Sequence, residues 1–124
     1  MNFKNMTLFF AVLILTSCGE QQTEQSNWYD ALPRESWSNY ELIDTDQDWF
    51  EVYKLTENTY AIYEPNQWQE AISYLLIGSQ RAMLIDTLQG IGDLKFVTDQ
   101  LTDLPIIVMN THSHYDHVSS NYKY

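Results

Sequence analysis

The chain has 124 residues, a formal net charge of −11 at pH 7, and 44% hydrophobic and 15% aromatic residues. This content of apolar side chains is typical of a sequence that forms a core, and it excludes a wholly disordered chain. The acidic charge repels phosphates and therefore excludes a nucleic-acid partner. The sole cysteine, Cys18, has no second thiol in the chain with which to form a disulfide.

The first residues have the features of a bacterial export signal. Lys4 precedes a short apolar run at residues 7–15, which is shorter than the about 20 residues that a membrane-spanning helix needs. Residues 15–18, Leu-Thr-Ser-Cys, resemble the cleavage box of a lipoprotein. The sequence therefore predicts a signal peptide at residues 1–17 and a lipid on Cys18, which anchors the protein to a membrane of the bacterial cell envelope, outside the cytoplasm. An ordinary buried strand or helix is the alternative for the apolar run.

Residues 18–48 are expected to form a lipidated tether followed by an acidic, aromatic arm. Residues 19–27 contain no apolar side chain and predict a flexible tether. Residues 28–48 are acidic but carry several aromatic and aliphatic residues, so they are expected to pack loosely on the domain that follows. The same aromatic residues could instead contact a ligand, and the sequence does not decide between the two.

A folded domain is expected at residues 49–124. Runs of β-branched and aromatic residues bounded by turn signals predict its first four strands. They cover residues 49–55, 59–64, 71–77 and 82–86. The third run is apolar without interruption from Tyr74 to Ile77, which predicts a strand buried on both faces with Leu76 in the core.

A helix and a fifth strand are expected next. Gly90 and Gly92 open a helix of about ten residues. Its apolar side is formed by Ile91, Leu94, Val97 or Thr98, and Leu101. Pro105 starts a short apolar strand that continues to Asn110, with Ile107 as a core position. The expected order is therefore four strands, a helix and a strand, with no internal repeat.

All three histidines of the chain lie within six residues directly after this last strand. The segment reads His112-Ser-His114-Tyr-Asp116-His117, and imidazoles together with a carboxylate are typical zinc ligands. In an extended segment His112 and His114 point to the same side and can reach one ion. Asp116 and His117 diverge in an extended chain, but a turn would aim both at a second ion. The motif therefore predicts two incomplete metal sites, each with two ligands.

The pattern His-x-His-x-Asp-His after an apolar strand resembles the signature of the metallo-β-lactamase-fold hydrolases. Residues 83–87, Met-Leu-Ile-Asp-Thr, are similar to an earlier strand of that family, which ends in an aspartate that supports the metal site. The resemblance extends from Trp49 to Tyr122. His117 favours the broad hydrolase set over the largest lactamase subgroup, which lacks histidine there. His114 argues against the di-iron flavoprotein branch, which has glutamate at this position.

The resemblance implies an α+β fold for residues 49–124. This fold is the N-terminal half of a metallo-β-lactamase-type αββα sandwich, which is mostly a β-sheet with one crossover helix. It also implies two Zn²⁺ ions in an intact family domain. His112 and His114 would bind the first ion, and Asp116 and His117 would bind the second.

The same resemblance implies a zinc-dependent hydrolase that acts on a small-molecule substrate through a metal-activated hydroxide. Asp116 would be catalytic, orienting this nucleophile while it binds the second ion, and Asp86 would support the metal ligands from behind. An aspartate at a strand end can also be only a turn former or a helix cap. Trp68 lies in a hairpin loop that overhangs the metal cleft in related hydrolases, where it could contact the substrate; the alternative is a tryptophan packed on the sheet edge. Lactams, lactones, thioesters and phosphoesters all stay open as substrates.

Two departures from the family pattern matter. Val118, Ser119 and Ser120 stand where the family has a small apolar residue and two glycines, which places side chains where backbones approach closely. The family's later ligands would lie beyond Tyr124, so the sequence predicts a truncated domain that binds at most one zinc ion weakly and is inactive alone. A non-enzymatic zinc-binding envelope lipoprotein and the product of an interrupted gene are the alternatives. The oligomeric state is left open.

Overall fold

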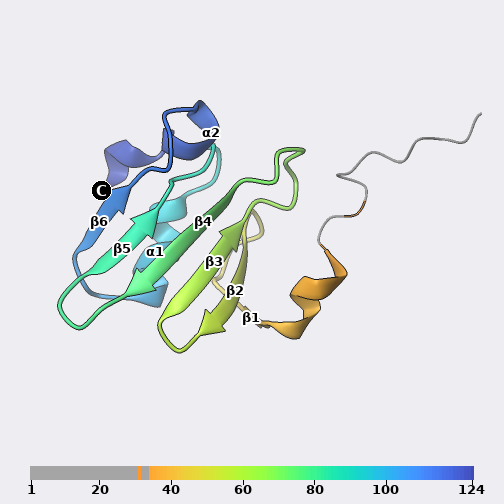
Figure 1. Cartoon of the computed structure of the whole chain (residues 1–124), viewed down its shortest axis with the longest axis horizontal. Coiled ribbons are helices and arrows are strands. Elements are labelled where there is room, and N and C mark those ends of the chain that lie inside the picture. Colours follow the sequence, from red (N-terminus) through yellow and green to blue (C-terminus); the bar gives the residue numbers. More distant parts are fainter. Residues whose placement is uncertain (1–30, 32–33) are drawn as a thin grey trace, which may run out of the picture.

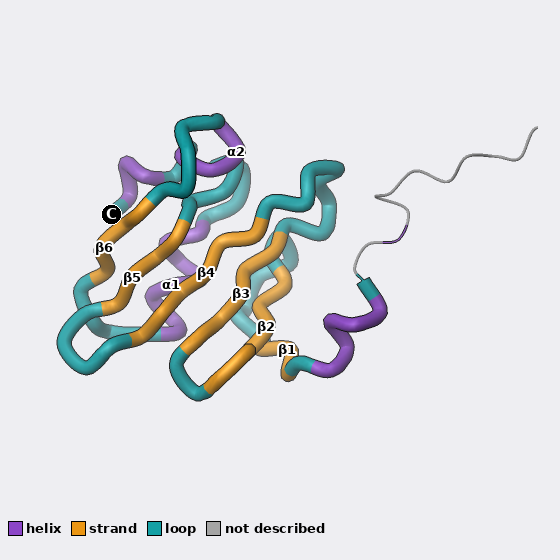
Figure 2. The backbone as a smooth tube through the Cα atoms, in the orientation of Figure 1, coloured by secondary structure: helices purple, strands orange, loops and turns teal. Residues whose placement is uncertain are grey.

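The structure is a computed structural model that describes residues 31 and 34–124 of the chain (Figures 1 and 2). The predicted signal peptide at residues 1–17, the predicted lipid site at Cys18 and the tether at residues 19–27 lie outside the described residues. Among the helices of the described part, none is both long and apolar enough to cross a membrane.

A six-stranded sheet forms the framework, and its strands lie side by side in chain order (Figure 1). They are β1 (Glu41–Ile43), β2 (Glu51–Thr56), β3 (Thr59–Tyr63), β4 (Ile72–Ile77), β5 (Ala82–Ile85) and β6 (Ile106–Met109). Neighbouring strands run antiparallel except β5 and β6, which are parallel. Helix α1 (Leu94–Leu101) makes the crossover between these two, because parallel neighbours cannot be joined by a tight turn.

The remaining helices are short. They are the 3-10 helices η2 (Glu35–Asn39) and η3 (Asn121–Lys123) and the single-turn helix α2 (Tyr115–Val118). A mixed sheet with one crossover helix and few other helical residues confirms the predicted α+β class. Each expected strand is present, with ends within two residues of those predicted.

The arm expected before residue 49 contributes an edge strand to the sheet. Strand β1 pairs antiparallel with β2. Trp37 of η2 packs edge-on against Tyr53 and Tyr63, with ring centroids 5.9 and 4.9 Å apart. The sequence did not predict β1, because three residues are too few to show the alternation of a strand. The predicted boundary at residue 49 stays a prediction.

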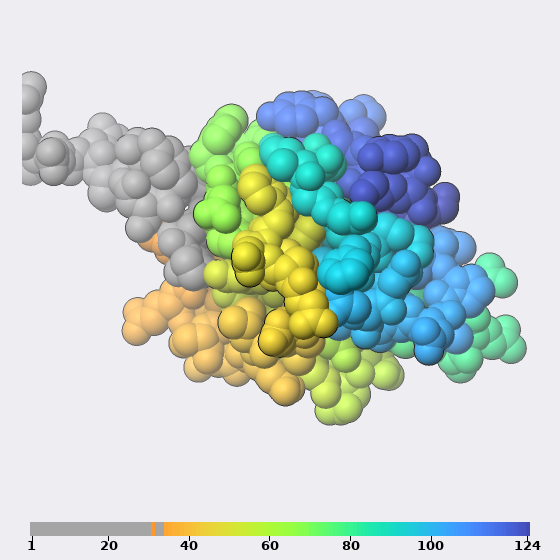
Figure 3. Space-filling view, turned by 180° about the vertical axis from the view of Figure 1, so that it is seen from behind, coloured from red at the N-terminus to blue at the C-terminus, as the bar shows by residue number. Residues whose placement is uncertain are grey.

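The hydrophobic core lies between α1 and one face of the sheet. Figure 3 views the molecule from this side, and the residues of α1, in blue, lie over the strands. Leu94 and Val97 of α1 are fully buried, as are Leu75 and Leu84 of the sheet. Burial of each such side chain stabilises the fold by about 1.5–3 kcal/mol.

Helix α1 has eight residues and begins later than predicted. Asp93 caps it by accepting a hydrogen bond from the Phe96 N–H (3.2 Å). Ile91, expected on the apolar side, precedes the helix and is 59% exposed. The prediction for Ile91 is therefore wrong, because the capping aspartate and not Gly90 sets the start of the helix.

The opposite face of the sheet carries no α-helix among the described residues, and only the short 3-10 helix η2 packs on part of it. Along β4, Leu75 is fully buried, whereas Tyr74 and Leu76 are 36% and 37% exposed. The prediction of a strand buried on both faces is wrong. The placement of Leu76 and Ile107 in the core is also wrong, since Ile107 is 41% exposed. Successive side chains of a strand point to opposite faces, and α1 covers only one of them.

Candidate metal centre

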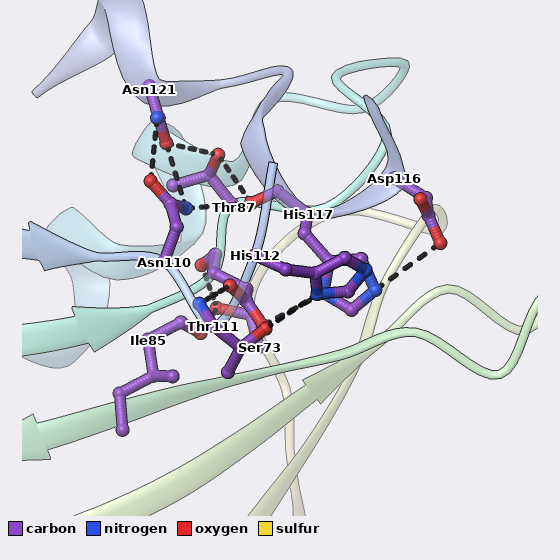
Figure 4. A network of polar contacts seen from close by, with 10 residues as sticks. Ser73, Ile85, Thr87, Asn110, Thr111, His112, Asp116, His117 and Asn121 are labelled. Carbon is purple, nitrogen blue, oxygen red and sulfur yellow. Dashed lines mark hydrogen bonds and ion pairs between the residues drawn. The ribbon is translucent and has the colours of Figure 1, made fainter. Parts of the chain in front are cut away.

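The histidine motif lies at the edge of the sheet where β5 and β6 both end. These strands are parallel and paired, with Ile85 opposite Met109, so their carboxyl ends are neighbours. Asp86 follows β5, and Thr111 follows β6 after one intervening residue. Figure 4 shows Thr111 here together with His112 and His117. The carboxyl ends of parallel strands are a common position for binding sites in α/β sheets.

Asp86 makes three hydrogen bonds at this edge through its carboxylate. It is 3% exposed, and its carboxylate lies 2.8 Å from each of three groups: the backbone N–H of Thr111, the Thr111 hydroxyl and Nδ1 of His117. Burial raises the pKa of this carboxyl, but the hydrogen bonds from His117 and Thr111 outweigh burial and hold the pKa below its ordinary value. Asp86 is therefore ionised at neutral pH and accepts from all three groups.

The turn after β5 is strained. Asp86 and Leu88 have left-handed backbones, with φ of 61° and 55°, which costs about 1–3 kcal/mol each in residues other than glycine. The Ser73 hydroxyl donates to the Asp86 carbonyl (2.7 Å), and the Ser119 N–H donates to the Leu88 carbonyl (3.2 Å). These contacts hold the turn in the conformation that presents the Asp86 carboxylate to the histidines.

The backbone of His117 is fixed by the same turn. Its carbonyl accepts from the Thr87 N–H and from the Asn110 amide, both at 2.8 Å. Asn121 completes this network, because its Oδ1 accepts from the Thr87 hydroxyl and its amide donates to Asn110, again at 2.8 Å (Figure 4). His117 is thus held at both its backbone and its ring.

The three imidazoles lie together as one group. The ring centroids of His112 and His114 are 4.5 Å apart, and those of His112 and His117 are 4.0 Å apart. The sequence motif predicts two separate pairs of metal ligands. In the structure, the single turn of α2 instead places the His117 ring against the His112 ring. In this turn the His117 N–H donates to the His114 carbonyl (3.0 Å).

The hydrogen bonds to Asp86 define which ring nitrogens are left free. Nδ1 of His117 donates to the ionised carboxylate, so Nε2 is the ring nitrogen left for another partner. The Thr111 hydroxyl also donates to Asp86, so it accepts from Nδ1 of His112 (3.1 Å) and leaves Nε2 of His112 free. This is the arrangement in which a carboxylate orients histidine ligands of a metal.

Asp116 lies beside one of these free nitrogens. Its Oδ2 is 3.3 Å from Nε2 of His117, and both side chains are largely buried. Two lone-pair atoms at this distance repel each other unless a proton or a metal cation lies between them.

The donor types at this edge fit zinc. Three imidazoles and one carboxylate are ligands that zinc accepts, and His112 and His114 are open to solvent. Within residues 31 and 34–124, however, no set of three or more His, Cys, Asp or Glu side chains is arranged to hold a metal ion. The residues present therefore fit zinc by chemistry, with two donors of the motif, Asp116 and His117, already side by side.

The loop between β3 and β4, residues 64–71, reaches the motif. Oε1 of Gln69 accepts from the Tyr115 hydroxyl and from the Gln89 amide, both at 3.0 Å. Next to Gln69, Trp68 is 63% exposed, so the alternative of a tryptophan packed on the sheet edge is wrong. Trp68 is thus open to solvent, and its contact with a substrate stays a prediction.

The residues after the motif fit despite their side chains. A Cβ at Gly90, which has φ of 74°, would lie 2.9 Å from Cβ of Ser119, so a side chain at position 119 requires glycine at position 90. Ser120 is fully buried, and its hydroxyl has no hydrogen-bond partner among the described residues. The departure from the family pattern is therefore accommodated locally.

Several residues of this site were not predicted. Thr111 and Asn110 directly precede the motif, so their position in the sequence was a usable signal. Ser73, Gln69 and Asn121 come from distant parts of the chain, and nothing in the sequence marked them.

Residues 69–124 match the family model described as the metallo-beta-lactamase superfamily. The matched segment contains β4 to β6, α1, Asp86 and the whole histidine motif. No curated protein and no solved structure matches the chain. The resemblance to the metallo-β-lactamase fold is thus confirmed over these residues, and the observed half-sandwich sheet with one crossover helix agrees with it.

Proposed function

We propose that this chain carries the metal-binding half of a zinc-dependent hydrolase of the metallo-β-lactamase fold. His112, His114, Asp116 and His117 are the proposed ligands, and Asp86 orients the rings of His112 and His117. The substrate is a small molecule with a scissile carbonyl or phosphoryl group.

The contact between Asp116 and His117 carries this proposal. A carboxylate oxygen and an imidazole nitrogen lie 3.3 Å apart, and the other nitrogen of the ring is committed to Asp86. A zinc ion at this pair would be bound by one oxygen and one nitrogen atom, both of which are donor types that zinc accepts. The match of residues 69–124 to the superfamily model supports the same function.

Each residue of the site has a defined task in this proposal. Bound zinc supplies Lewis-acid activation of water and of the scissile bond. Asp86 holds His112 and His117 with Nε2 free, and Asp116 accepts a proton or orients a water molecule through Oδ2. Trp68 and Tyr115, 63% and 59% exposed, offer apolar surface to the part of the substrate that does not react.

Zinc storage without catalysis is the second candidate. The three clustered imidazoles, two of them exposed, favour it because they can bind a metal without a substrate cleft. In this case the protein would be a zinc-binding envelope lipoprotein.

Zinc stoichiometry and hydrolysis, measured on the dialysed 124-residue chain, test the proposal. A catalytic zinc keeps about three protein ligands, and among the described residues no three ligands of the motif are arranged around one ion. We therefore expect at most one weakly bound zinc ion and no turnover of lactam, lactone or phosphodiester substrates. The double variant His112→Ala, His114→Ala should lose the ion.

A matched pair of carboxylate variants controls this experiment. Asp116→Ala should weaken zinc binding, whereas Asp103→Ala, which removes an exposed carboxylate outside the motif, should not. Absence of any zinc binding would refute the metal site. Two tightly held zinc ions with metal-dependent hydrolysis by a monomer would refute the ligand count.

We also propose that the protein is anchored to a membrane of the cell envelope through lipid on Cys18. The apolar run at residues 7–15 and the polar tether after Cys18 support this. Replacing Cys18 with Ala should move the protein from the membrane fraction to the soluble fraction, or leave it as an unprocessed precursor. A mature-sized variant that still fractionates with membranes would count against lipidation.

A further inference from the structure

A hydrogen bond joins the loop between β3 and β4, residues 64–71, to the single-turn helix α2. The Tyr115 hydroxyl donates to Oε1 of Gln69 at 3.0 Å. These two residues are 46 positions apart in the chain, and the loop and α2 lie at the same end of the sheet (Figure 1). Tyr115 stands between His114 and Asp116, two of the proposed metal ligands. The loop is therefore connected directly to the segment that carries these ligands.

The same Gln69 oxygen also reaches a third segment. It accepts a second hydrogen bond, at 3.0 Å, from the side-chain amide of Gln89. Gln89 belongs to the strained turn after β5, in which the Asp86 carboxylate accepts from the His117 ring. An amide oxygen has two lone pairs, so these two donors use its full accepting capacity. One atom of Gln69 thus joins the loop to both segments that form the proposed metal site.

Helix α2 depends on such contacts because it is too short to be stable by itself. It has four residues, none of them buried, and its N-cap residue, His114, makes no capping hydrogen bond with its side chain. A single helical turn is unfavourable in isolation, because ordering its backbone costs more than one hydrogen bond returns. The C-terminal part of α2 is held by the hydrogen bonds that the His117 carbonyl accepts. Among the described residues, only the bond to Gln69 ties the side chain of Tyr115, the first residue of α2, to a distant segment.

The loop is also fixed on either side of Gln69. At its start, Glu64 is 1% exposed and accepts a hydrogen bond from an indole N–H (2.9 Å). Near its end, Glu70 forms a bidentate ion pair with Arg34. Trp68 lies between these two contacts and is 63% exposed. A change in the position of Gln69 is therefore confined to the middle of the loop and moves Trp68, its neighbour in the chain.

We propose that Gln69 is a positioning residue, which places the loop relative to the metal ligands and transmits metal binding from α2 to the loop. The inference rests on the proposed zinc site, because zinc bound by residues of α2 fixes the helix and the Tyr115 hydroxyl with it. A fixed hydroxyl stays bonded to Gln69 for a larger fraction of the time, so zinc makes the loop more ordered. By the same linkage, loss of the Gln69 contact weakens zinc binding.

Fluorine NMR of the full chain labelled with fluorotryptophan tests the proposal. The chain has four tryptophans, and Trp68→Phe identifies the Trp68 signal. The chemical shift of this signal reports the position of the loop, and its line width reports the mobility of the loop. Added zinc should shift the Trp68 signal saturably. The midpoint should equal that of the histidine Nε2 resonances, which report the metal site independently.

Variants in the loop assign the effect to Gln69. Gln69→Met keeps the length of the side chain and removes the acceptor oxygen. Without metal its Trp68 signal should narrow, because the loop gains mobility, and saturating zinc should no longer shift it. Its zinc affinity should fall by about two- to tenfold, as expected for the loss of one hydrogen bond. Gln67→Met makes the same change at a residue whose hydrogen bond, among the described residues, is made by its backbone, and it should behave like the parent chain.

Two further variants separate the hydrogen bond from the side chain. Gln69→Glu keeps an acceptor oxygen at the same position and should retain the zinc-dependent shift of the Trp68 signal. Tyr115→Phe removes the donor and should reproduce the behaviour of Gln69→Met. The double variant should show no additional effect, because both substitutions break the same bond.

Failure of the inference is distinguishable from failure of the proposed function. Histidine resonances that zinc leaves unchanged in the parent chain would refute the zinc site. Equal Trp68 line widths in metal-free parent and Gln69→Met would overturn the positioning role, whether or not zinc binds. Histidine resonances that shift while the Trp68 signal does not would overturn the transmission alone. So would a Trp68 shift that persists in Gln69→Met, because zinc would then act on the tryptophan directly.

Discussion

Two buried carboxyl groups of this fold have pKa values that are shifted in opposite directions. Asp86 receives three hydrogen bonds, and its pKa is held low despite burial. Glu64 is 1% exposed and receives a hydrogen bond from the Trp49 indole (2.9 Å) and a long one from the Gln89 N–H (3.4 Å). Burial outweighs these two bonds and raises the pKa of Glu64. The number and quality of donors thus decide in which direction the pKa of each buried carboxyl is shifted.

Glu64 should therefore make the unfolding free energy depend on pH. Its pKa in the folded protein is raised above the ordinary value of 4.5, so its stabilising contribution is fully present below that pH and is lost as pH rises through the raised pKa. Glu64→Gln removes this titration and keeps an oxygen for Trp49. The difference in unfolding free energy between variant and parent should shift in favour of the variant from about pH 4 to about pH 7.

Chemical denaturation at both pH values measures this difference. Glu57→Gln, at a side chain that is 91% exposed, is the control and should show no such shift. A Glu64→Gln difference that is constant across this pH range would mean that the carboxyl is not desolvated in the folded protein.

For individual residues, the sequence predicted the motif and a supporting role for Asp86, but not the contacts of Thr111 and Ser73. His112, His114, Asp116 and His117 stand out because the chain has no histidine outside this motif and because the pattern is dense. The bonds that orient them depend on Asp86 and on Ser73, which reach the motif only after the crossover and the β4–β5 pairing form. A contact that forms only when two pairs of strands have come together leaves no pattern among neighbouring residues of the sequence.

Two neighbouring leucines of strand β4 differ in burial because they lie on opposite faces of the sheet. Leu75 is fully buried against α1, and Leu76, its neighbour on the other face, is 37% exposed. Leu75→Ala should cost about 2–5 kcal/mol of unfolding free energy, whereas Leu76→Ala should cost less than about 1 kcal/mol. The two variants control each other, because the change in composition is identical. Equal losses in equilibrium denaturation would contradict the one-sided burial of β4.

The sequence predicted the positions of the strands more accurately than it predicted which of their residues are buried. Turn residues and β-branched runs fix where a strand begins and ends, so β2 to β6 were found. Which face is covered depends on where α1 packs, and an unbroken apolar run such as residues 74–77 carries no alternation to show it. Helix α2, with four residues, is too short to leave a periodic pattern.

The whole molecule combines a closed face, an open face and a polar edge. α1 and the core make the closed face, while η2 packs on part of the open face. The edge after β5 and β6 carries the histidine motif, and this is the part that the superfamily model matches together with the strands beneath it.

Long-range ¹H–¹⁵N NMR of the imidazole rings tests whether Asp86 orients the histidines for zinc. We expect neutral His112 and His117 to carry their proton on Nδ1, and added zinc to shift their Nε2 resonances. In Asp86→Asn this preference should weaken, and zinc affinity should fall by about 10–100-fold. Rings protonated on Nε2 in the parent chain, or Nε2 resonances that zinc leaves unchanged, would contradict the account.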